Sequence, residues 1–117
     1  MPTIRDVVQA LSRRDGVEAV IILGNDGLPI DSQAAPGHDS EAVAAHLPGL
    51  LQAAEELGRS ANRGELTAGV LEYADGLAVV ANLSADAKLL VLARPHANLG
   101  PLLYDLARHR VQIARLL

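Results

Sequence analysis

Between residues 40 and 61, apolar side chains recur at alternating steps of four and three residues. The positions are Val43, Leu47, Leu50, Ala54, Leu57 and Ala61, and the same face is widened by Ala44, Leu51 and Gly58. This spacing predicts one long amphipathic helix that begins near Ser40, after Asp39 as its N-cap. Pro48 lacks a backbone N–H and is expected to kink or loosen the helix midway. Two interpretations stay open: the helix covers one face of a sheet, or it also packs against a second copy of itself.

Short apolar runs separated by turn residues lie on both sides of this helix. They predict strands over residues 17–23, 28–32, 66–73, 77–83 and 88–93. Further helices are expected over 4–14 and from Asn98, as N-cap, to residue 117. Pro29 cannot donate to a strand ladder, so its strand is expected at a sheet edge. The order helix–strand–strand–helix–strand–strand–strand–helix predicts an α+β fold, with a five-stranded antiparallel sheet flanked by three helices.

The length of 117 residues predicts a single domain, residues 1–117. A net charge of −4, with Tyr73 and Tyr104 as the aromatic residues, counts against nucleic-acid binding. The longest stretch without a charged residue, 42–54, has 13 residues and is too short for a membrane span. Arg5 and Asp6 are charged too early for a signal peptide, so we expect a cytoplasmic protein.

No motif in the sequence carries recognisable catalytic or cofactor-binding chemistry. Cysteine is absent, which excludes disulfides, thiolate nucleophiles and cysteine-ligated metal sites. No pair of histidines has the spacing of a helical zinc site; they are His38, His46, His96 and His109. We therefore expect no enzyme activity, no cofactor, no metal and no catalytic residue.

The predicted strand over residues 66–73 follows the long helix directly. At the open edge of a sheet it would present unpaired backbone groups, and pairing with the same strand of a second copy would satisfy them. The candidate residues of such a homodimer interface are Val43, Leu47, Leu50, Leu51, Ala54 and Leu57 on the helix, with Gly69, Val70 and Leu71 on the strand.

Four stretches taken together, in this order and spacing, carry a family resemblance. They are the first helix leading into Gly16-Val17-Glu18-Ala19-Val20-Ile21-Ile22, the hairpin Asn25-Asp26-Gly27-Leu28-Pro29-Ile30, the Ala/Leu-rich second helix, and Ala97-Asn98-Leu99-Gly100. The chain resembles the roadblock/dynein light chain family, and within it the small bacterial regulators of Ras-like GTPases of the MglB type. The resemblance implies a roadblock/profilin-like sheet, with the second helix on one face and the terminal helices on the other.

The resemblance also implies a function. Family members form two-fold dimers through their second helices and third strands, and act as regulators of small GTPases or as adaptors. In the MglB type, the dimer surface bearing the second helices engages the GTPase near its switch regions and promotes hydrolysis. Carried over, this makes the polar residues of the second helix candidate partner contacts: Gln52, Glu55, Glu56, Arg59 and Arg63.

The leading hypothesis is thus a non-catalytic homodimeric regulator of a Ras-like GTPase. An arginine supplied to the GTPase in trans, from Arg59 or Arg63, is one mechanism, although such residues are more often solvated helix-end charges. Two alternatives stay open: an adaptor of a motor, motility or signalling complex without effect on GTP hydrolysis, and a small-ligand sensor that uses the sheet face as a pocket.

Overall fold

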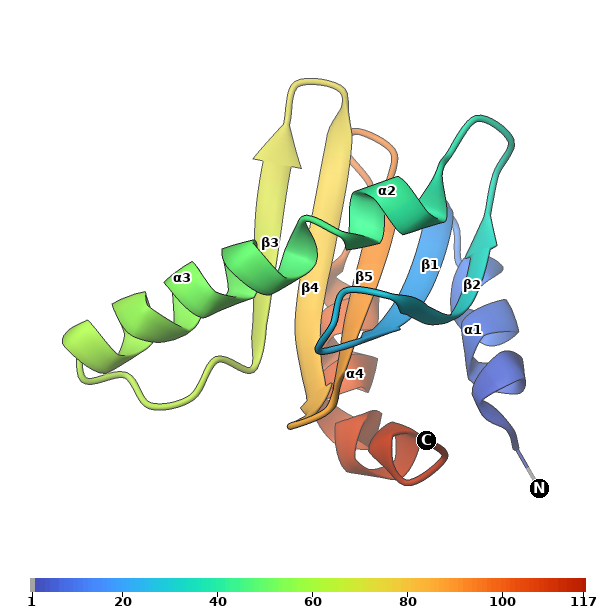
Figure 1. Ribbon diagram of the computed structural model, residues 1–117. Helices are drawn as coiled ribbons and strands as arrows, with labels where there is room; N and C mark the ends of the chain where they lie inside the picture. Colours follow the sequence, from blue (N-terminus) through green and yellow to red (C-terminus); the bar gives the residue numbers. More distant parts are fainter. Residues whose placement is uncertain (1) are drawn as a thin grey trace.

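The computed structural model describes residues 2–117 and contains one five-stranded antiparallel sheet between two layers of helices (Figure 1). In chain order the elements are α1 (Ile4–Ser12), β1 (Val17–Gly24), β2 (Pro29–Ala34), α2 (Ser40–Ala44), α3 (Leu47–Ser60), β3 (Ala68–Tyr73), β4 (Gly76–Ser84), β5 (Ala87–Ala93) and α4 (Gly100–Ala114). The predicted fold class and order of elements are confirmed, with one helix divided in two.

The predicted helix over residues 40–61 is divided at Ala45 and His46 into α2 and α3. Asp39 caps α2 as expected, because its side chain accepts a hydrogen bond from the Ala42 N–H. Pro48 lies in the first turn of α3, where a missing N–H costs least. The expected midway kink is therefore a break between two helices, located two to three residues before the proline.

The strands lie in the order β2-β1-β5-β4-β3, so β2 and β3 form the two edges. Residues Ala19 to Leu23 of β1 are all buried, because helices cover both faces of the sheet at this strand. Pro29 begins β2, which confirms the expectation of an edge strand there. The β3 strand begins at Ala68, two residues later than predicted.

Two apolar clusters form the core, one on each face of the sheet. The larger lies under α1 and α4 and includes Val8, Leu11, Leu102, Leu106 and Ile113. The smaller lies under α2 and α3 and includes Ala44, Leu47 and Leu51. The arrangement matches the expectation that the terminal helices share one face and the second helix covers the other.

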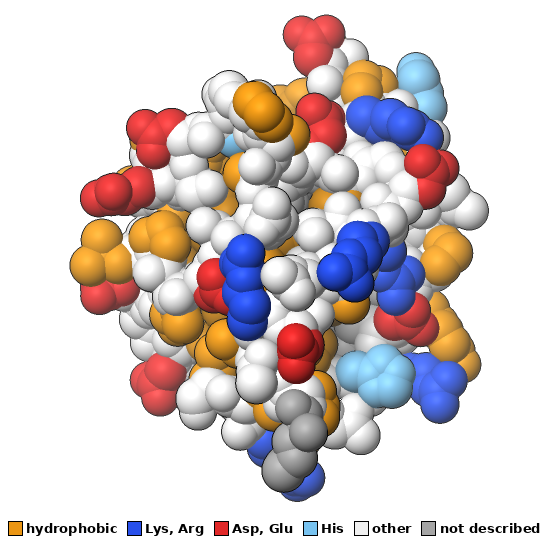
Figure 2. All heavy atoms as spheres, turned by 90° about the vertical axis from the view of Figure 1, so that its right-hand side faces the viewer, with side chains coloured by type: hydrophobic (Ala, Val, Ile, Leu, Met, Phe, Trp, Pro, Cys, Tyr) orange, Lys and Arg blue, Asp and Glu red, His pale blue; other side chains and the backbone are white. Residues whose placement is uncertain are grey.

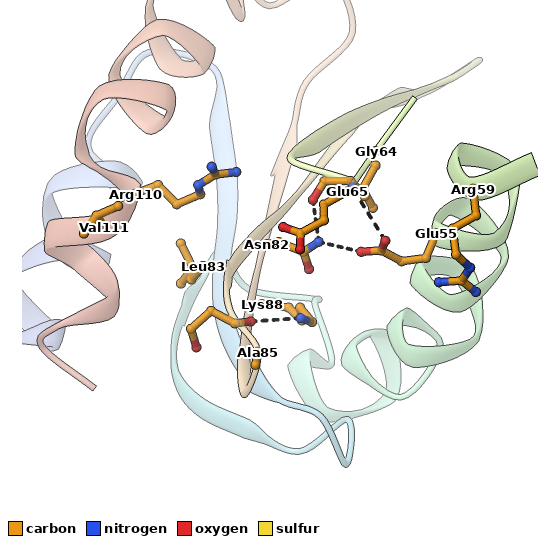
Figure 3. Close-up of a pocket in the computed structure, with 12 residues that line it drawn as sticks. Glu55, Arg59, Gly64, Glu65, Asn82, Leu83, Ala85, Lys88, Arg110 and Val111 are labelled. Carbon is orange, nitrogen blue, oxygen red and sulfur yellow. Dashed lines mark hydrogen bonds between the residues drawn. The ribbon is translucent and has the colours of Figure 1, made fainter. Parts of the chain in front are cut away.

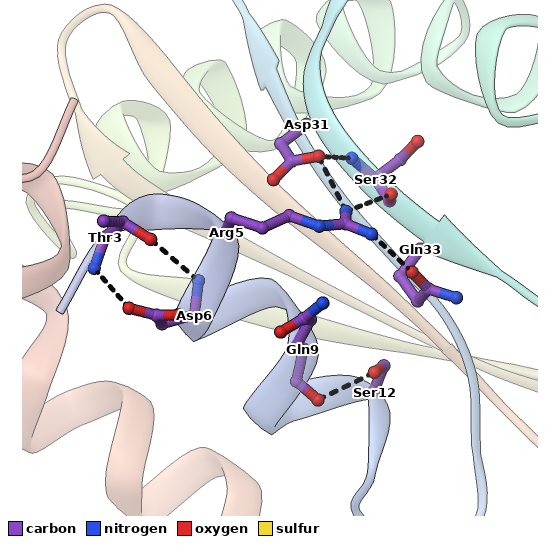
Figure 4. A network of polar contacts seen from close by, with 8 residues as sticks. All are labelled: Thr3, Arg5, Asp6, Gln9, Ser12, Asp31, Ser32 and Gln33. Atoms are coloured by element: carbon purple, nitrogen blue, oxygen red, sulfur yellow. Dashed lines mark hydrogen bonds and ion pairs between the residues drawn. The ribbon is translucent and has the colours of Figure 1, made fainter.

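The two edges of the sheet differ in how they are protected. Arg5 on α1 reaches over β2, where its guanidinium donates to the Asp31 carboxylate, the Ser32 carbonyl and the Gln33 side chain (Figure 4). These contacts occupy polar groups of an edge that could otherwise pair with another chain. The β3 edge lies on the opposite side of the molecule, beneath α3 (Figure 1).

The last helix begins slightly later than the sequence suggests. Leu99 is the N-cap residue of α4, and the Asn98 side chain accepts a hydrogen bond from the Gly100 N–H one step earlier in the chain. In residues 2–117, none of the helices has both the length and the apolar character needed to cross a membrane.

Candidate dimer and partner-binding face

Helix α3 crosses the sheet over β4 and β3, and its C-terminal half extends past the edge of β3 (Figure 1). The first half is anchored, because Leu47 and Leu51 are buried against the sheet. Leu57, in the projecting half, leaves 69% of its surface exposed, and Leu50 leaves 37%. A single exposed leucine is common on protein surfaces, so its meaning depends on the apolar surface that lies near it.

An apolar groove of about 510 Å³ lies between the start of α3 and the sheet. Hydrophobic side chains from two helices and three strands form nearly all of its wall. The lining residues are Val43, His46, Leu47, Leu50, Leu71, Tyr73, Ala78, Val80, Leu90 and Leu92. Because the protomer leaves this groove open, part of the sheet face under α3 is still accessible to another apolar surface.

The β3 strand borders this groove and has one neighbour in the sheet, β4. In the register, Gly69 is opposite Val80 and Leu71 is opposite Ala78, which puts both on the groove face. Val70 is opposite Val79 and points to the other face, with 45% of its surface exposed. An open strand edge, an apolar groove and a projecting helix therefore meet at one side of the protomer.

The sequence analysis assigned nine residues to this interface, and the structure divides them by exposure. Leu50, Leu57 and Val70 are exposed, whereas Val43, Ala54, Gly69 and Leu71 are half-buried around the groove. Leu47 and Leu51, which have the same heptad spacing, lie inside the core of their own protomer. These two residues hold α3 on the sheet. The sequence period identifies the apolar face of a helix, but it does not tell which part of that face the sheet covers.

Of the five candidate partner contacts, Glu55 turns inward. Its carboxylate accepts hydrogen bonds from the Asn82 side-chain amide at 2.9 Å and from the Leu66 N–H at 3.4 Å, and the same amide donates to the Leu66 carbonyl at 2.6 Å (Figure 3). Leu66 is thereby bound through side chains in place of a strand ladder, which explains why β3 begins later than predicted.

Gln52, Glu56, Arg59 and Arg63 are exposed. Among the residues that the structure describes, neither arginine takes part in an ion pair. Arg59 lines an open hollow of about 710 Å³ between α3 and α4, whose wall mixes charged side chains such as Glu55, Lys88 and Arg110 with apolar ones (Figure 3). Gln52, Glu56 and Arg59 are thus accessible on α3, whereas Arg63 lies three residues after the last residue of that helix.

Sequence reasoning missed Asn82 and Tyr73. Asn82 is a polar residue in the apolar strand β4, and that interruption was the signal available for its structural role. Its Oδ1 atom is buried without a hydrogen-bond partner in residues 2–117. Tyr73 ends β3 beside the groove with 60% of its surface exposed. An aromatic residue so placed adds a large apolar contact area to the open side.

The described part of the chain contains no cluster of metal-ligating side chains. Across residues 2–117, no three His, Cys, Asp or Glu side chains come close enough to hold an ion. Two histidines contact neighbours singly: His38 lies 3.8 Å from the Glu18 carboxylate, and His109 lies 2.9 Å from the Gln112 side chain. The features that α3 and β3 present are an open strand edge, an apolar groove and an exposed leucine.

Comparison with solved structures gives the same architecture. The chain is similar to a Roadblock/LC7 domain from Streptomyces avermitilis, with 23% identity, a TM-score of 0.78, and 95% and 91% of the two chains covered. It is also similar to MglB of Myxococcus xanthus, with 17% identity, a TM-score of 0.85, and 97% and 93% covered. It is similar as well to the gliding protein MglB of Thermus thermophilus, with 16% identity, a TM-score of 0.82, and 97% and 87% of the two chains covered.

At these low sequence identities, the similarity to the solved structures shows a shared fold and nothing more. No curated protein matches the sequence. The family model of the Roadblock/LC7 domain matches residues 3–93, from the start of α1 to the end of β5. Because that match extends over most of the 117 residues, the chain belongs to the Roadblock/LC7 domain family.

Proposed function

We propose that this chain is a homodimeric regulator of a Ras-like small GTPase. The observation that carries the proposal is that three features share one side of the protomer: Leu57 lies largely exposed on the projecting half of α3, the edge of β3 is open, and an apolar groove lies between the sheet and the start of α3. A second copy has the matching surfaces, since a two-fold interface brings the same patch together from both sides.

The geometry of such a dimer follows from the edge strand. If β3 pairs antiparallel with its symmetry mate, the two sheets join into one and the two-fold axis stands perpendicular to it. The axis reverses the direction of each α3, so the helices lie antiparallel on one face. Each projecting half then reaches over the partner protomer. Leu57 and Leu50 become buried in the interface, which removes their apolar surface from solvent.

The two α3 helices would together form the platform for the GTPase. Gln52, Glu56 and Arg59 supply polar contacts along its outer surface, and Arg63 adds one just after the end of α3. The GTPase contributes its own phosphate site and magnesium, while the platform binds one conformation of the switch loops more tightly than another. The choice of partner comes from the resemblance to MglB-type regulators of Ras-like GTPases, and the shared fold with two MglB structures supports that resemblance.

The test is GTP turnover by a purified Ras-like GTPase from the same organism, with increasing amounts of this protein. We expect saturable stimulation of hydrolysis or exchange, and a complex in gel filtration that depends on the bound nucleotide. Equal affinity for the GTP and GDP forms shifts no population and would indicate an adaptor. The absence of both a complex and a change in turnover would end the proposal.

A further inference from the structure

The outward side of α4 presents a stripe that neither the core nor the proposed dimer uses. Four residues at steps of four, three and four form it, and we call them the outer stripe: Tyr104, Arg108, Val111 and Arg115. They lie opposite the buried Leu102, Leu106 and Ile113 on the same helix. Tyr104 is 62% exposed and Val111 is 60% exposed, so the stripe combines apolar and cationic side chains in solvent.

The stripe is cationic in a protein that is acidic overall. Residues 100–117 contain three arginines and one acid, Asp105, whose carboxylate is bound by Arg14. Residues 17–99 contain 11 acids and four bases. Figure 2 shows the side of the molecule that carries α1 and β2, where acidic side chains lie along one edge and acidic and basic side chains are mixed over the rest.

Two other carboxylates near the terminal helices are bound by groups of the protein itself. The Asp6 carboxylate accepts from the Thr3 N–H, and Asp15 pairs with Arg94. Glu72 on β3 faces the same side of the sheet as α4, since its register partner Leu77 shares a strand face with Val79, which is buried under α1 and α4. The Arg108 guanidinium lies over the Tyr104 ring, 5.5 Å from its centre, which keeps charge and aromatic surface together.

We propose that the outer stripe docks the protein onto an anionic phospholipid surface. Arginine guanidinium groups pair with phosphate oxygens, while tyrosine and valine side chains suit the boundary between headgroups and acyl chains. Helix α4 lies beyond residues 3–93, so the stripe belongs to a part of the chain outside the family match.

The inference rests on the proposed dimer for its strength. A two-fold axis perpendicular to the joined sheet places both α4 helices on the same side, opposite the α3 platform. Two stripes that face one way match a flat surface, and the second binds at the high effective concentration set by the first. A flat anionic layer can bind both stripes at once, whereas a single acidic peptide cannot. In that orientation the GTPase platform would face away from the membrane.

The experiment is co-sedimentation of the full chain with vesicles of phosphatidylcholine alone or with about 30% phosphatidylserine, at about 0.1 M salt. The test variant is Arg108→Gln/Arg115→Gln. The charge-matched control is Arg59→Gln/Arg63→Gln, which removes two exposed arginines at the end of α3 and in the loop after it. Each arginine near an anionic surface contributes about fivefold to affinity, so the test variant should lose at least about 25-fold while the control binds lipid as the wild type does.

Binding that needs phosphatidylserine, weakens at about 0.5 M salt and fails in the test variant alone supports the proposal. Three results would overturn the proposal: the wild type does not bind the vesicles, it binds both lipid compositions equally, or the control variant loses as much affinity as the test variant. An acidic protein would then be the remaining partner for the stripe. Sedimentation velocity without lipid separates the two proposals: a dimer that does not bind vesicles refutes the membrane site alone, whereas a monomer refutes the proposed dimer.

Discussion

The carboxylate of Glu55 on α3 accepts a hydrogen bond from the side-chain amide of Asn82 on β4, 2.9 Å away. The same amide donates to the Leu66 carbonyl, so one asparagine joins the projecting helix, the loop after it and the sheet. Both side chains are half-buried. Through this contact Glu55 positions the α3–β3 connection.

We expect Asn82→Ala to lower the free energy of unfolding by about 1–3 kcal/mol, because it removes the donor to the Leu66 carbonyl and to one oxygen of the Glu55 carboxylate. Chemical denaturation gives the value. Glu56→Ala is the matched control, since Glu56 is exposed on the same helix, and its change should stay within about 0.5 kcal/mol. Equal losses in both variants would refute the role assigned to Asn82.

A second prediction concerns pH. The hydrogen bond from Arg14 is the largest cause that holds the pKa of Asp105 below its usual range, and it outweighs the opposing effect of burial. A carboxyl with a depressed folded pKa stabilises the protein above its unfolded pKa, about 3.9, and loses that contribution as pH falls through the folded value. Asp105→Asn should therefore be less stable than wild type at neutral pH.

The measurement is the thermal midpoint of both proteins between about pH 7 and pH 2.5. The difference between them should shrink below about pH 4, where the wild-type carboxyl begins to protonate. A difference that stays constant through the acid range would mean that Asp105 contributes through packing and not through its charge.

The third prediction concerns Gly27, which has a φ of +80° in the β1–β2 turn, a conformation that disfavours other residues. A Cβ there would lie 3.2 Å from Cγ of Pro48 at the start of α3. Gly27→Ala should cost about 1–3 kcal/mol through both the positive φ and the close approach. Gly37→Ala separates the causes, since it shares a positive φ of +96° but meets no atom within 4 Å. A larger loss at position 37 in denaturation would contradict the packing role of Pro48.

The fourth prediction addresses how the proposed platform acts on its GTPase. Arg63→Ala should weaken the complex about 5- to 50-fold, mainly by slowing association, and the effect should fade at high salt. Single-turnover hydrolysis at saturation should change little. A loss of about 10³-fold at saturation would mean that Arg63 enters the GTPase site in trans, and would replace docking with direct catalysis.

Much of the fold was predictable because local rules and tertiary packing agree. The turn Asn25-Asp26-Gly27 and the buried runs of β1, β4 and β5 predicted the sheet, and Pro29 predicted an edge. The start of β3 was not predictable from propensity. Leu66 is bonded through Asn82 and Glu55, two side chains distant in the sequence.

The candidate site was predictable only in outline. Heptad spacing placed Leu47, Leu50, Leu51 and Leu57 on one helix face, but the sheet covers two of them and leaves two accessible. That division depends on where β3 ends the sheet beneath α3, which is a tertiary property. Periodicity along one helix contains no information about the width of the surface on which it lies.

The most direct test of the account is sedimentation equilibrium of the wild type, Leu57→Glu and the control Gln112→Glu, which adds the same charge on α4. Burying a carboxylate in place of a leucine costs several kcal/mol, and each dimer contains the change twice. We predict a wild-type and control mass twice that of one chain, and a folded monomer for Leu57→Glu. A wild type that stays monomeric at high concentration, or a Leu57→Glu protein that still dimerises like the control, would contradict the interface.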